Sequence, residues 1–493
     1  MENKLPGERV PSRPLNIVTI VLDCARAKNF ATSGGDQLAE TPAIDSLAAQ
    51  GTAFPRAVAP ANWTVPSHLS IFTGLYPNVH GIRTYQKRTV PLETTASSLR
   101  EHGYETAMFT ENVHLVGGYG LEHGFDVQCC VKGRISEEEK TFINGIVGRA
   151  GFLYSSRMRK LISRLPPLIT PLSLLFHSQE VAFKKEVTGE YVVTGFDNWL
   201  ASRSPDRPFY AFFNLVDTHD PYDLIPDGER PGFLDRVYLN APRFYVLSVP
   251  GFQSHMRPGP LVRGYVKSIE AADRKIGRLL RLLEKHGEKE RTMVIVTSDH
   301  GEAFGELGNY FHGCGATDSV LRVPLVVSAP RGITLPRKVD RWVSLCEVDS
   351  WVKAAAAGGV PYDDDAHAPF PYSRTAPDYT TVYGEGGPAS DQIRSLKGIK
   401  SGQSWNHRLL AAYRGDEKYV LDFDTSAVLH WTGSGDPDLE TPEYLSHDSA
   451  AGARREVFGP YETAEAARLA RSAKGPEPVD VEIDRRLRSW GYD

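Results

Sequence analysis

The sequence lacks a long apolar run, a secretory leader and a disulfide framework. No stretch of its 493 residues approaches the roughly 18 consecutive apolar residues that a membrane span requires. Residues 1–14 are polar and proline-rich, unlike a signal peptide. The five cysteines are odd in number and show no disulfide spacing. We therefore expect a reduced, cytoplasmic protein with no transmembrane segment.

An excess of positive charge is also absent. The formal net charge is -5, and proteins that bind nucleic acid usually carry a basic surface, so we expect no nucleic-acid partner. The contents of hydrophobic residues, 41%, and charged residues, 24%, are those of an ordinary globular protein. The chain is long enough for one large α/β domain and a smaller second one.

Four apolar runs rich in β-branched residues predict strands buried on both faces, as in a parallel sheet. They are residues 15–22, 209–216, 292–298 and 323–328. Apolar residues at helical spacing predict a helix over 262–286, and Gly287 is a typical helix stop. This alternation predicts an α/β fold with a mostly parallel central sheet flanked by helices. Three of the strands are followed by Asp or His, at the sheet edge where such folds bind ligands.

The segment 62–77 carries the most informative motif. It begins Asn-Trp-Thr-Val-Pro-Ser-His and ends Thr-Gly-Leu-Tyr-Pro. It resembles the sulfatase signature, Cys-x-Pro-x-Arg followed by Thr-Gly-x-Tyr-Pro, with Thr64 at the cysteine position and His68 at the arginine position. The resemblance covers residues 16 to about 330 in order and identifies the chain as a sulfatase-like member of the alkaline phosphatase superfamily. It implies that family's fold, with a small C-terminal subdomain whose four-stranded sheet packs beside the main one.

Threonine at position 64 changes the chemistry that the resemblance implies. Sulfatases oxidise their cysteine to formylglycine, whose aldehyde hydrate attacks sulfur. Thr64 carries a methyl group on Cβ, so the same oxidation could give only a ketone. The resemblance therefore implies a plain alkoxide, as in the phosphodiesterases and phosphoethanolamine or phosphoglycerol transferases of this superfamily. Pro66 indicates a helix that begins just after Thr64, with N-terminal N–H groups facing a bound anion; a mere helix-capping role for Thr64 is the alternative.

Asp23 comes directly after the first predicted strand, where an unpaired charge in low dielectric is costly. A metal ion is its natural partner, and capping of the following segment is the alternative. The sequence from Asp23 to Lys28 resembles the Asp-x-x-Arg-Ala-Asp motif of phosphonate monoester hydrolases, with Lys28 replacing the last Asp. Cys24 stands where sulfatases with paired aspartates have a second carboxylate, so one ligand of their calcium site is missing.

Asp299 and His300 follow the third strand, and an adjacent Asp and His can both turn toward one ion. With Asp23 and Thr64 they predict a site for one divalent metal ion. The mixed oxygen and nitrogen donors favour manganese or zinc, with calcium or magnesium as alternatives. The ion would make the hydroxyl of Thr64, otherwise a weak nucleophile, easier to deprotonate.

Further site residues follow from the resemblance. His219 lies in Thr-His-Asp-Pro-Tyr, which resembles a His-x-Pro-Tyr motif whose histidine contacts the substrate oxyanion or leaving group. His312 matches a His-Gly that follows Asp-His-Gly in many relatives. We expect both to be catalytic. His114 and Asn112 fall where sulfatases have Lys-x-His-Leu, and with His68 we expect them to bind substrate. A structural hydrogen-bonding role is the alternative for each histidine.

A second ion is left open, because Asp217, His219 and His312 are plausible ligands. None of these three residues stands in the Asp-x-x-x-His spacing of two-zinc phosphodiesterases. We therefore expect one ion.

The domain organisation follows from changes in the sequence pattern. We expect a catalytic α/β domain over 1–379 and a C-terminal subdomain over 380–493, where residues 413–423 indicate a turn and an antiparallel strand. Residues 131–200 indicate a helical insertion or cap. Its basic amphipathic stretch 157–164 suggests, as the alternative, a lid or surface for a lipid-like anionic substrate. The oligomeric state is left open, and a homo-oligomer is one alternative.

These features predict a metal-dependent hydrolase or transferase of phosphoesters or phosphonate esters, in which Thr64 forms a phosphothreonine intermediate. The substrate would be a small-molecule or lipid-like anionic ester. One alternative is a sulfatase that manages without formylglycine. A second is a catalytically silent relative that binds an anion or a partner protein.

Overall fold

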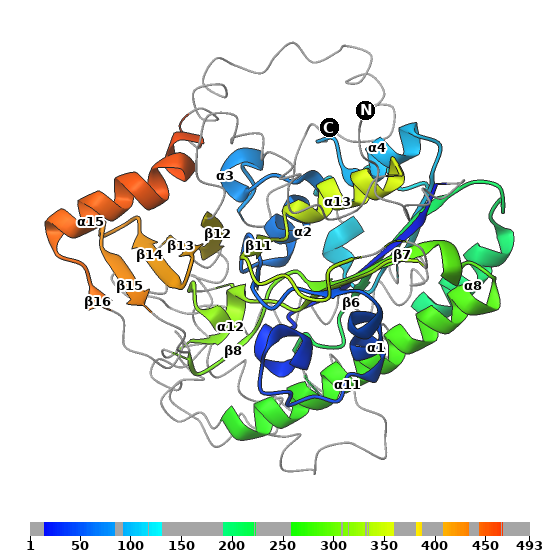
Figure 1. Cartoon of the computed structure of the whole chain (residues 1–493), viewed down its shortest axis with the longest axis horizontal. Helices are drawn as coiled ribbons and strands as arrows, with labels where there is room; N and C mark the ends of the chain where they lie inside the picture. The colour runs from blue at the N-terminus through cyan, green and yellow to red at the C-terminus, as the bar shows by residue number, and fades with distance from the viewer. Residues whose placement is uncertain are drawn as a thin grey trace, which may run out of the picture.

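The structure is a computed structural model of the whole chain (Figure 1). It describes residues 14–83, 92–130, 191–222, 258–358, 381–386, 408–432 and 443–466, apart from 117, 221, 307, 308, 314, 331, 332, 334 and 465. The predicted insertion lies outside these residues except for 191–200, and the tail after 466 also lies outside them. Within the described ranges, none of the helices has the length and apolar character that crossing a bilayer requires.

A seven-stranded sheet forms the centre of the protein. Its central strand β1 runs parallel to β6 and β7, β4 and β5 continue the parallel run beyond β6, and β10 is antiparallel to both β7 and β2. In order across the sheet the strands are β2 (Thr52–Ala53), β10 (Leu325–Ser328), β7 (Thr292–Ser298), β1 (Asn16–Leu22), β6 (Phe209–Leu215), β4 (Glu105–Thr110) and β5 (Val127–Cys130).

Helices cover both faces of this sheet (Figure 1). Side chains alternate between the two faces of the sheet along each strand, so neighbouring residues pack against opposite layers of helices. In β1, Val18 and Ile20 pack into one hydrophobic cluster, and Ile17 and Val21 pack into the other. One face carries α1 (Pro42–Gln50), α8 (Tyr191–Ser202) and α11 (Pro258–Lys285); the other carries α2 (Thr64–Thr73), α4 (Thr95–Glu101) and α13 (Glu347–Ala356).

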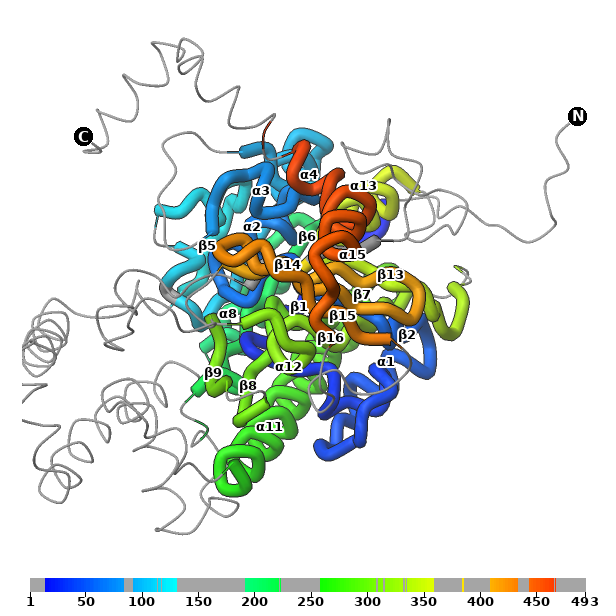
Figure 2. Tube along the Cα trace, turned by 90° about the vertical axis from the view of Figure 1, so that its left-hand side faces the viewer, coloured from blue at the N-terminus to red at the C-terminus, as the bar shows by residue number. Residues whose placement is uncertain are grey.

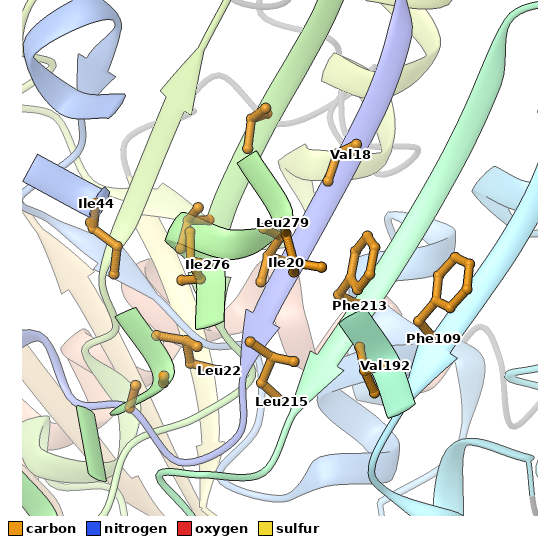
Figure 3. Packing of buried hydrophobic residues seen from close by; sticks show 14 of the residues in the cluster. Val18, Ile20, Leu22, Ile44, Phe109, Val192, Phe213, Leu215, Ile276 and Leu279 are labelled. Atoms are coloured by element: carbon orange, nitrogen blue, oxygen red, sulfur yellow. The ribbon is translucent and has the colours of Figure 1, made fainter. Parts of the chain in front are cut away.

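Figure 3 shows the first of these clusters from close by. Ile276 and Leu279 of α11 lie against Ile20, and Val192 of α8 lies beside Phe213. All of these side chains are fully buried, and burial of each stabilises the fold by about 1.5–3 kcal/mol. The periodic apolar residues that predict a helix over 262–286 thus form the buried face of α11.

The expected fold class is confirmed, and the boundaries of the central elements differ little from those predicted. The strand predicted at 292–298 is β7 itself, and those predicted at 15–22 and 209–216 are each one residue shorter. The fourth strand, predicted from 323, begins at Leu325 as β10. The strands β4 and β5 were not predicted.

The C-terminal region forms a separate five-stranded antiparallel sheet, which Figure 2 shows facing the viewer. Its strands are β12 (Thr381–Gly386), β13 (Leu409–Arg414), β14 (Glu417–Asp422), β15 (Val428–Thr432) and β16 (Glu443–Tyr444). The turn that the sequence predicts within 413–423 lies at residues 415–416 and joins β13 to β14. The sheet has one strand more than the resemblance implies, because the two-residue β16 pairs with the edge of β15. Tyr413 and Trp431 pack against α12 (Asp318–Leu321) of the main domain.

Shorter elements complete the described chain. They are 3-10 turns η1 (Ala27–Asn29), η2 (Ala31–Ser33), η3 (Val113–Val116) and η6 (Lys289–Arg291), helices α3 (Pro77–His80) and α15 (His447–Ala453), the π-helical η9 (Arg454–Phe458), and strands β3 (Ala57–Val58), β8 (Ala303–Phe304), β9 (Tyr310–Phe311) and β11 (Val343–Ser344).

Candidate active site

The predicted metal ligands meet at the carboxyl end of the two central strands. The parallel register of β1 and β7 pairs Leu22 with Ser298. Asp23 and Asp299 each follow one of these residues, so the sheet itself places the two carboxylates side by side. One oxygen of each and a ring nitrogen of His300 lie within 4.8 Å of one another.

Thr64 approaches this group from the start of α2. It is the first residue of the helix, and Trp63 occupies the capping position, so Thr64 is not a helix cap. Its Oγ1 lies 3.4 Å from Nε2 of His300. Pro66 fits in the first turn because the first four N–H groups of a helix have no intrahelical acceptor. The structure thus brings the four expected ligands together, and their coordination of an ion stays a prediction.

His300 presents a neutral ring nitrogen to the site. Its Nδ1 lies 2.9 Å from the carbonyl oxygen of Gly301, and a carbonyl only accepts, so Nδ1 carries the proton. Burial, followed by the nearby His312, lowers the pKa of His300 to about 3. The lone pair of Nε2 therefore faces Thr64 and the two carboxylates, as a metal ligand requires.

One oxygen of Asp299 is left without a hydrogen-bond donor by the described part of the chain. Its Oδ1 accepts from the backbone N–H groups of Cys24, at 3.2 Å, and His300, at 2.9 Å. Its Oδ2 is buried and has no hydrogen-bond donor among the described residues. Burial, followed by the charge of Asp23, raises the pKa of Asp299 well above its usual range. An unsatisfied buried carboxylate oxygen is costly, so the site fits a divalent cation.

Asp23 is held by polar partners on its other side. Asn112 donates to Oδ2 at 2.8 Å, and the thiol of Cys24 donates to Oδ1 at 3.3 Å. Burial alone would raise the pKa of Asp23, but nearby histidines, His219 first and then His300, hold it well below its usual range. The predicted capping role is not needed to explain this side chain, because it points into the site.

The two expected catalytic histidines lie together beside the metal ligands. The ring centroids of His219 and His312 are 4.9 Å apart. Nδ1 of His312 is 3.1 Å from Oε1 of Glu302. Nδ1 of His219 is 2.8 Å from the carbonyl oxygen of Asp220 and 2.9 Å from its Oδ1. The side chain of His219 is 22% exposed, so it lies on the open side of the site.

Trp63 forms a wall of the site next to Thr64. Its ring lies 5.4 Å from that of His312. A Cβ added to Gly313, whose φ is 78°, would lie 2.1 Å from the Trp63 ring. The turn after His312 therefore requires glycine on two grounds, its backbone conformation and its contact with the tryptophan.

The expected substrate-binding residues occupy different depths. His68 is fully buried beneath the site, with Nδ1 2.9 Å from the carbonyl oxygen of Thr64 and Nε2 3.2 Å from Nδ2 of Asn214. Asn112 uses its amide on Asp23 and accepts from the N–H of His114 at 2.9 Å. These partners favour a supporting role for His68 and Asn112. Their contact with substrate, like that of the half-buried His114, stays a prediction.

Sequence reasoning missed a buried ion group behind the site. Nζ of Lys275 lies 2.6 Å from Oε1 of Glu111 and 2.7 Å from Oδ2 of Asp217. Asp217, which the sequence leaves open as a ligand for a second ion, is thus engaged in an ion pair with Lys275. One signal could have revealed Lys275. It lies three residues after Ala272 and four before Leu279, so it is a charged residue on the apolar face of α11.

Comparison with known proteins agrees with this geometry. Residues 15–348, more than half of the chain, match the family model described as Sulfatase. A ulvan-active sulfatase of Formosa agariphila is 25% identical over 67% of this chain and 60% of its own length. An endo-4-O-sulfatase of Bacteroides thetaiotaomicron is 24% identical over 53% of this chain and 52% of its own length. The chain thus spans less than two thirds of these two relatives.

Solved structures show the same fold. A phosphonate monoester hydrolase of Agrobacterium radiobacter superimposes with a TM-score of 0.61 at 19% identity, covering 92% of this chain and 96% of that one. A putative sulfatase of Bacteroides thetaiotaomicron gives a TM-score of 0.62 at 15% identity, with 92% and 93% covered.

Proposed function

The chain belongs to the sulfatase family, and we propose that it is a metal-dependent hydrolase or phosphotransferase of phosphate or phosphonate esters with Thr64 as its nucleophile. The observation that carries the proposal is the position of the Thr64 hydroxyl. It lies at the start of α2, 3.4 Å from Nε2 of His300 and next to two buried carboxylates. A threonine cannot become an aldehyde, so the hydroxyl oxygen itself must attack.

The donor set comprises Asp23, Thr64, Asp299 and His300, and suits manganese or zinc. When bound, the ion lowers the pKa of the Thr64 hydroxyl and offsets the charge of the two carboxylates. In our proposal the positive end of the α2 dipole, at Thr64, also favours an anionic ester there. Thr64 is thus positioned to attack phosphorus with its hydroxyl oxygen.

We assign His219 and His312 to protonation of the leaving group. His219 and His312 lie side by side next to the predicted metal ligands, and His219 is partly open to solvent. In our proposal the Thr64 hydroxyl releases its proton to solvent as its oxygen bonds to phosphorus. A histidine proton passes to the ester oxygen as the bond of that oxygen to phosphorus breaks, which leaves a phosphothreonine. Water then releases phosphate from Thr64 in a hydrolase, and an alcohol accepts it in a transferase.

Sulfate-ester hydrolysis is the second candidate, because the curated relatives are named sulfatases. A sulfated threonine, however, lacks the second hydroxyl through which an aldehyde hydrate expels sulfate. A phosphothreonine can be displaced by a second in-line attack at phosphorus. This difference favours phosphate and phosphonate esters over sulfate esters.

A substrate panel tests the proposal. Protein reconstituted with Mn²⁺ or Zn²⁺ is assayed with nitrophenyl phosphate monoesters and diesters, phosphonates and sulfates. We expect phosphodiester or phosphonate turnover to exceed sulfate turnover by orders of magnitude. Sulfate turnover that equals or exceeds the others would instead establish the second candidate.

A further inference from the structure

Glu302 is a buried acid to which the proposed function gives no role. It lies in the loop between β7 and β8, and its side chain is fully buried. Its carbonyl oxygen accepts from Nη1 of Arg26 at 3.3 Å. The N–H of the preceding Gly301 donates to the carbonyl oxygen of Val320 at 2.9 Å. The backbone is thus held on both sides, so the fold around the loop sets the position of the carboxylate.

The carboxylate of Glu302 faces one ring. Its Oε1 lies 3.1 Å and its Oε2 lies 3.4 Å from Nδ1 of His312. Within the described part of the chain, His312 is the one group that forms an ion pair with this carboxylate. The thiol of Cys24 lies farther from the same nitrogen, at 3.5 Å. A carboxylate accepts, so Nδ1 of His312 carries a proton toward Glu302, and the other ring nitrogen, Nε2, is left for chemistry.

The ring of His312 is confined by three other rings. Its centroid lies 4.7 Å from that of His300, 4.9 Å from that of His219 and 5.4 Å from that of Trp63. His300 in turn lies 3.4 Å from Oγ1 of Thr64, so His312 is one side chain removed from the proposed nucleophile. Packing limits where the ring can lie, and the contact with Glu302 determines which of its two nitrogens is turned away from the carboxylate.

His219 is oriented in a different way. Its Nδ1 lies 2.8 Å from the carbonyl oxygen of Asp220 and 2.9 Å from Oδ1 of the same residue, so its partner is the next residue in the chain. The side chain of His219 is 22% exposed and that of His312 is 7% exposed. Of the two histidines assigned to the leaving group, His312 is therefore the one that is sheltered from water and fixed by a side chain from another part of the site.

We propose that Glu302 is a positioning residue for the leaving-group step: it holds the Nδ1 proton of His312 and so directs Nε2 of that ring toward the ester oxygen. In this step the Nε2 proton of the doubly protonated ring passes to the ester oxygen. The electron pair of the breaking bond to phosphorus stays on that oxygen. The ring is left neutral, with its remaining proton on Nδ1, and it regains a proton from the water or alcohol that releases the phosphothreonine.

The negative charge of Glu302 also stabilises the positive ring before the transfer. Serine hydrolases divide the roles of a buried carboxylate and a histidine in the same way. The inference rests on the proposed function for the existence of this step. It adds which of the two histidines supplies the proton and which residue orients it.

Esters that differ only in the acidity of their leaving group test this role. The metal-replete full chain and its Glu302→Gln variant are compared on nitrophenyl, phenyl and alkyl esters of one phosphonate. A nitrophenolate leaves without a proton, whereas an alkoxide needs one. We expect Glu302→Gln to lower kcat for the alkyl ester by about 100-fold or more, and for the nitrophenyl ester by less than about tenfold. KM and metal content should change little.

Further variants separate positioning from a structural role. His312→Asn should show the same dependence on the leaving group. Glu302→Gln combined with His312→Asn should be no slower than His312→Asn alone, because Glu302 acts through that ring. Glu302→Asp keeps the charge at a longer distance and should show a smaller loss of the same kind, which preserves the test if Glu302→Gln fails to fold.

Glu306→Gln is the matched control. Glu306 is an acid in the same part of the chain, but it pairs with Arg26 at 2.7 Å. Any loss in Glu306→Gln should therefore be equal for the three esters.

The inference is overturned if Glu302→Gln slows the three esters equally or slows none of them. Losses that multiply in the double variant also overturn it. The same series can be made from sulfates, so the class of ester that the protein prefers tests the proposed function, and the dependence on the leaving group tests Glu302. A protein that turns over only sulfates but shows this dependence would refute the proposed function and retain the role of Glu302.

Discussion

At the scale of single residues, the chemistry that we propose depends on the hydroxyl oxygen that lies beside the two predicted metal-binding carboxylates. Thr64 is held there by its position at the first residue of α2, and the carbonyl of the same residue is bound by the buried His68. The proposed nucleophile and its support are therefore one local unit. Changing the hydroxyl should affect the chemistry far more than the fold.

Thr64→Ala should abolish turnover and leave folding and most metal affinity in place. Water can replace a neutral ligand, but nothing replaces an oxygen that forms the covalent intermediate. We expect a loss on the order of a millionfold in kcat, as for other nucleophiles that act together with their supporting groups. Thr64→Ser keeps the hydroxyl with a looser rotamer and should retain measurable activity.

Mass spectrometry of wild-type protein quenched during turnover should show a phosphate-sized adduct on the peptide that contains Thr64. Near-wild-type activity in Thr64→Ala would mean that water is the nucleophile.

At the scale of elements, the site depends on α11, which contributes no residue to it. Lys275 joins Glu111, at the end of β4, to Asp217, at the end of β6. The other oxygen of Glu111 accepts from the N–H of Val216 at 3.0 Å. This buried group ties together the two loops that carry Asn112 and His219.

Lys275→Met should destabilise the protein by about 3–5 kcal/mol, because it leaves two buried carboxylates without their cation. The lost tie between the loops should also lower kcat. Urea unfolding measures the first effect. Lys285→Met is the matched control: it is on the same helix, but its pair with Asp197 is exposed, and exposed pairs contribute little to stability. Equal losses in both variants would rule out a special role for Lys275.

The same group predicts a dependence of stability on pH. Burial raises the pKa of Glu111 from 4.5 to about 7, against the opposing effect of Lys275. A raised pKa of an acid means that the folded state binds more protons than the unfolded state. The contribution of Glu111 to the free energy of unfolding is therefore full below pH 4.5 and is lost as pH rises through 7. Between pH 5 and 8 the wild type should lose more stability than Glu111→Gln, by roughly 1–3 kcal/mol.

Unfolding midpoints in urea at the two pH values measure this difference. Glu284→Gln changes an exposed glutamate of α11 and should behave as the wild type does. An identical pH dependence in Glu111→Gln would contradict the assignment.

Elements buried on both faces could be predicted from sequence, and elements with mixed burial could not. β1, β6 and β7 are wholly buried, and their apolar composition shows it. β5 is an edge strand with exposed residues, and its sequence gives no pattern. The residues that meet at the candidate site could be predicted because each follows a strand end or stands in a motif. The partners of Lys275 could not, because helical spacing gives the face of a residue but not the distant carboxylates that meet it.

At the scale of the whole molecule, the bound ion should stabilise the folded state. The strand ends that carry Asp23 and Asp299 belong to the two central strands of the main sheet, so repulsion between the carboxylates bears on its core. A cation that binds only the folded state stabilises it by mass action. Metal removal should therefore lower the unfolding temperature, on the order of 5 °C.

The size of this effect should depend on pH. In the metal-free protein the pKa of Asp299 is raised well above its usual range by burial and by Asp23. Its stabilising contribution is therefore full below its unfolded pKa and is lost as pH rises through the folded value. The pKa of Asp23 is lowered, so its contribution is already complete at pH 5 and does not change above it. Metal-free protein should thus weaken from pH 5 to pH 8.

Bound metal removes that weakening, because the ion keeps both carboxylates charged and paired. Scanning calorimetry of metal-free and metal-replete protein should show a larger difference in unfolding temperature at pH 8 than at pH 5. Asp299→Asn, which cannot titrate at this position and lacks a charged ligand, should show a small difference at both. If the difference in unfolding temperature between metal-replete and metal-free wild type is equal at the two pH values, the two carboxylates do not share an ion and the metal site lies elsewhere.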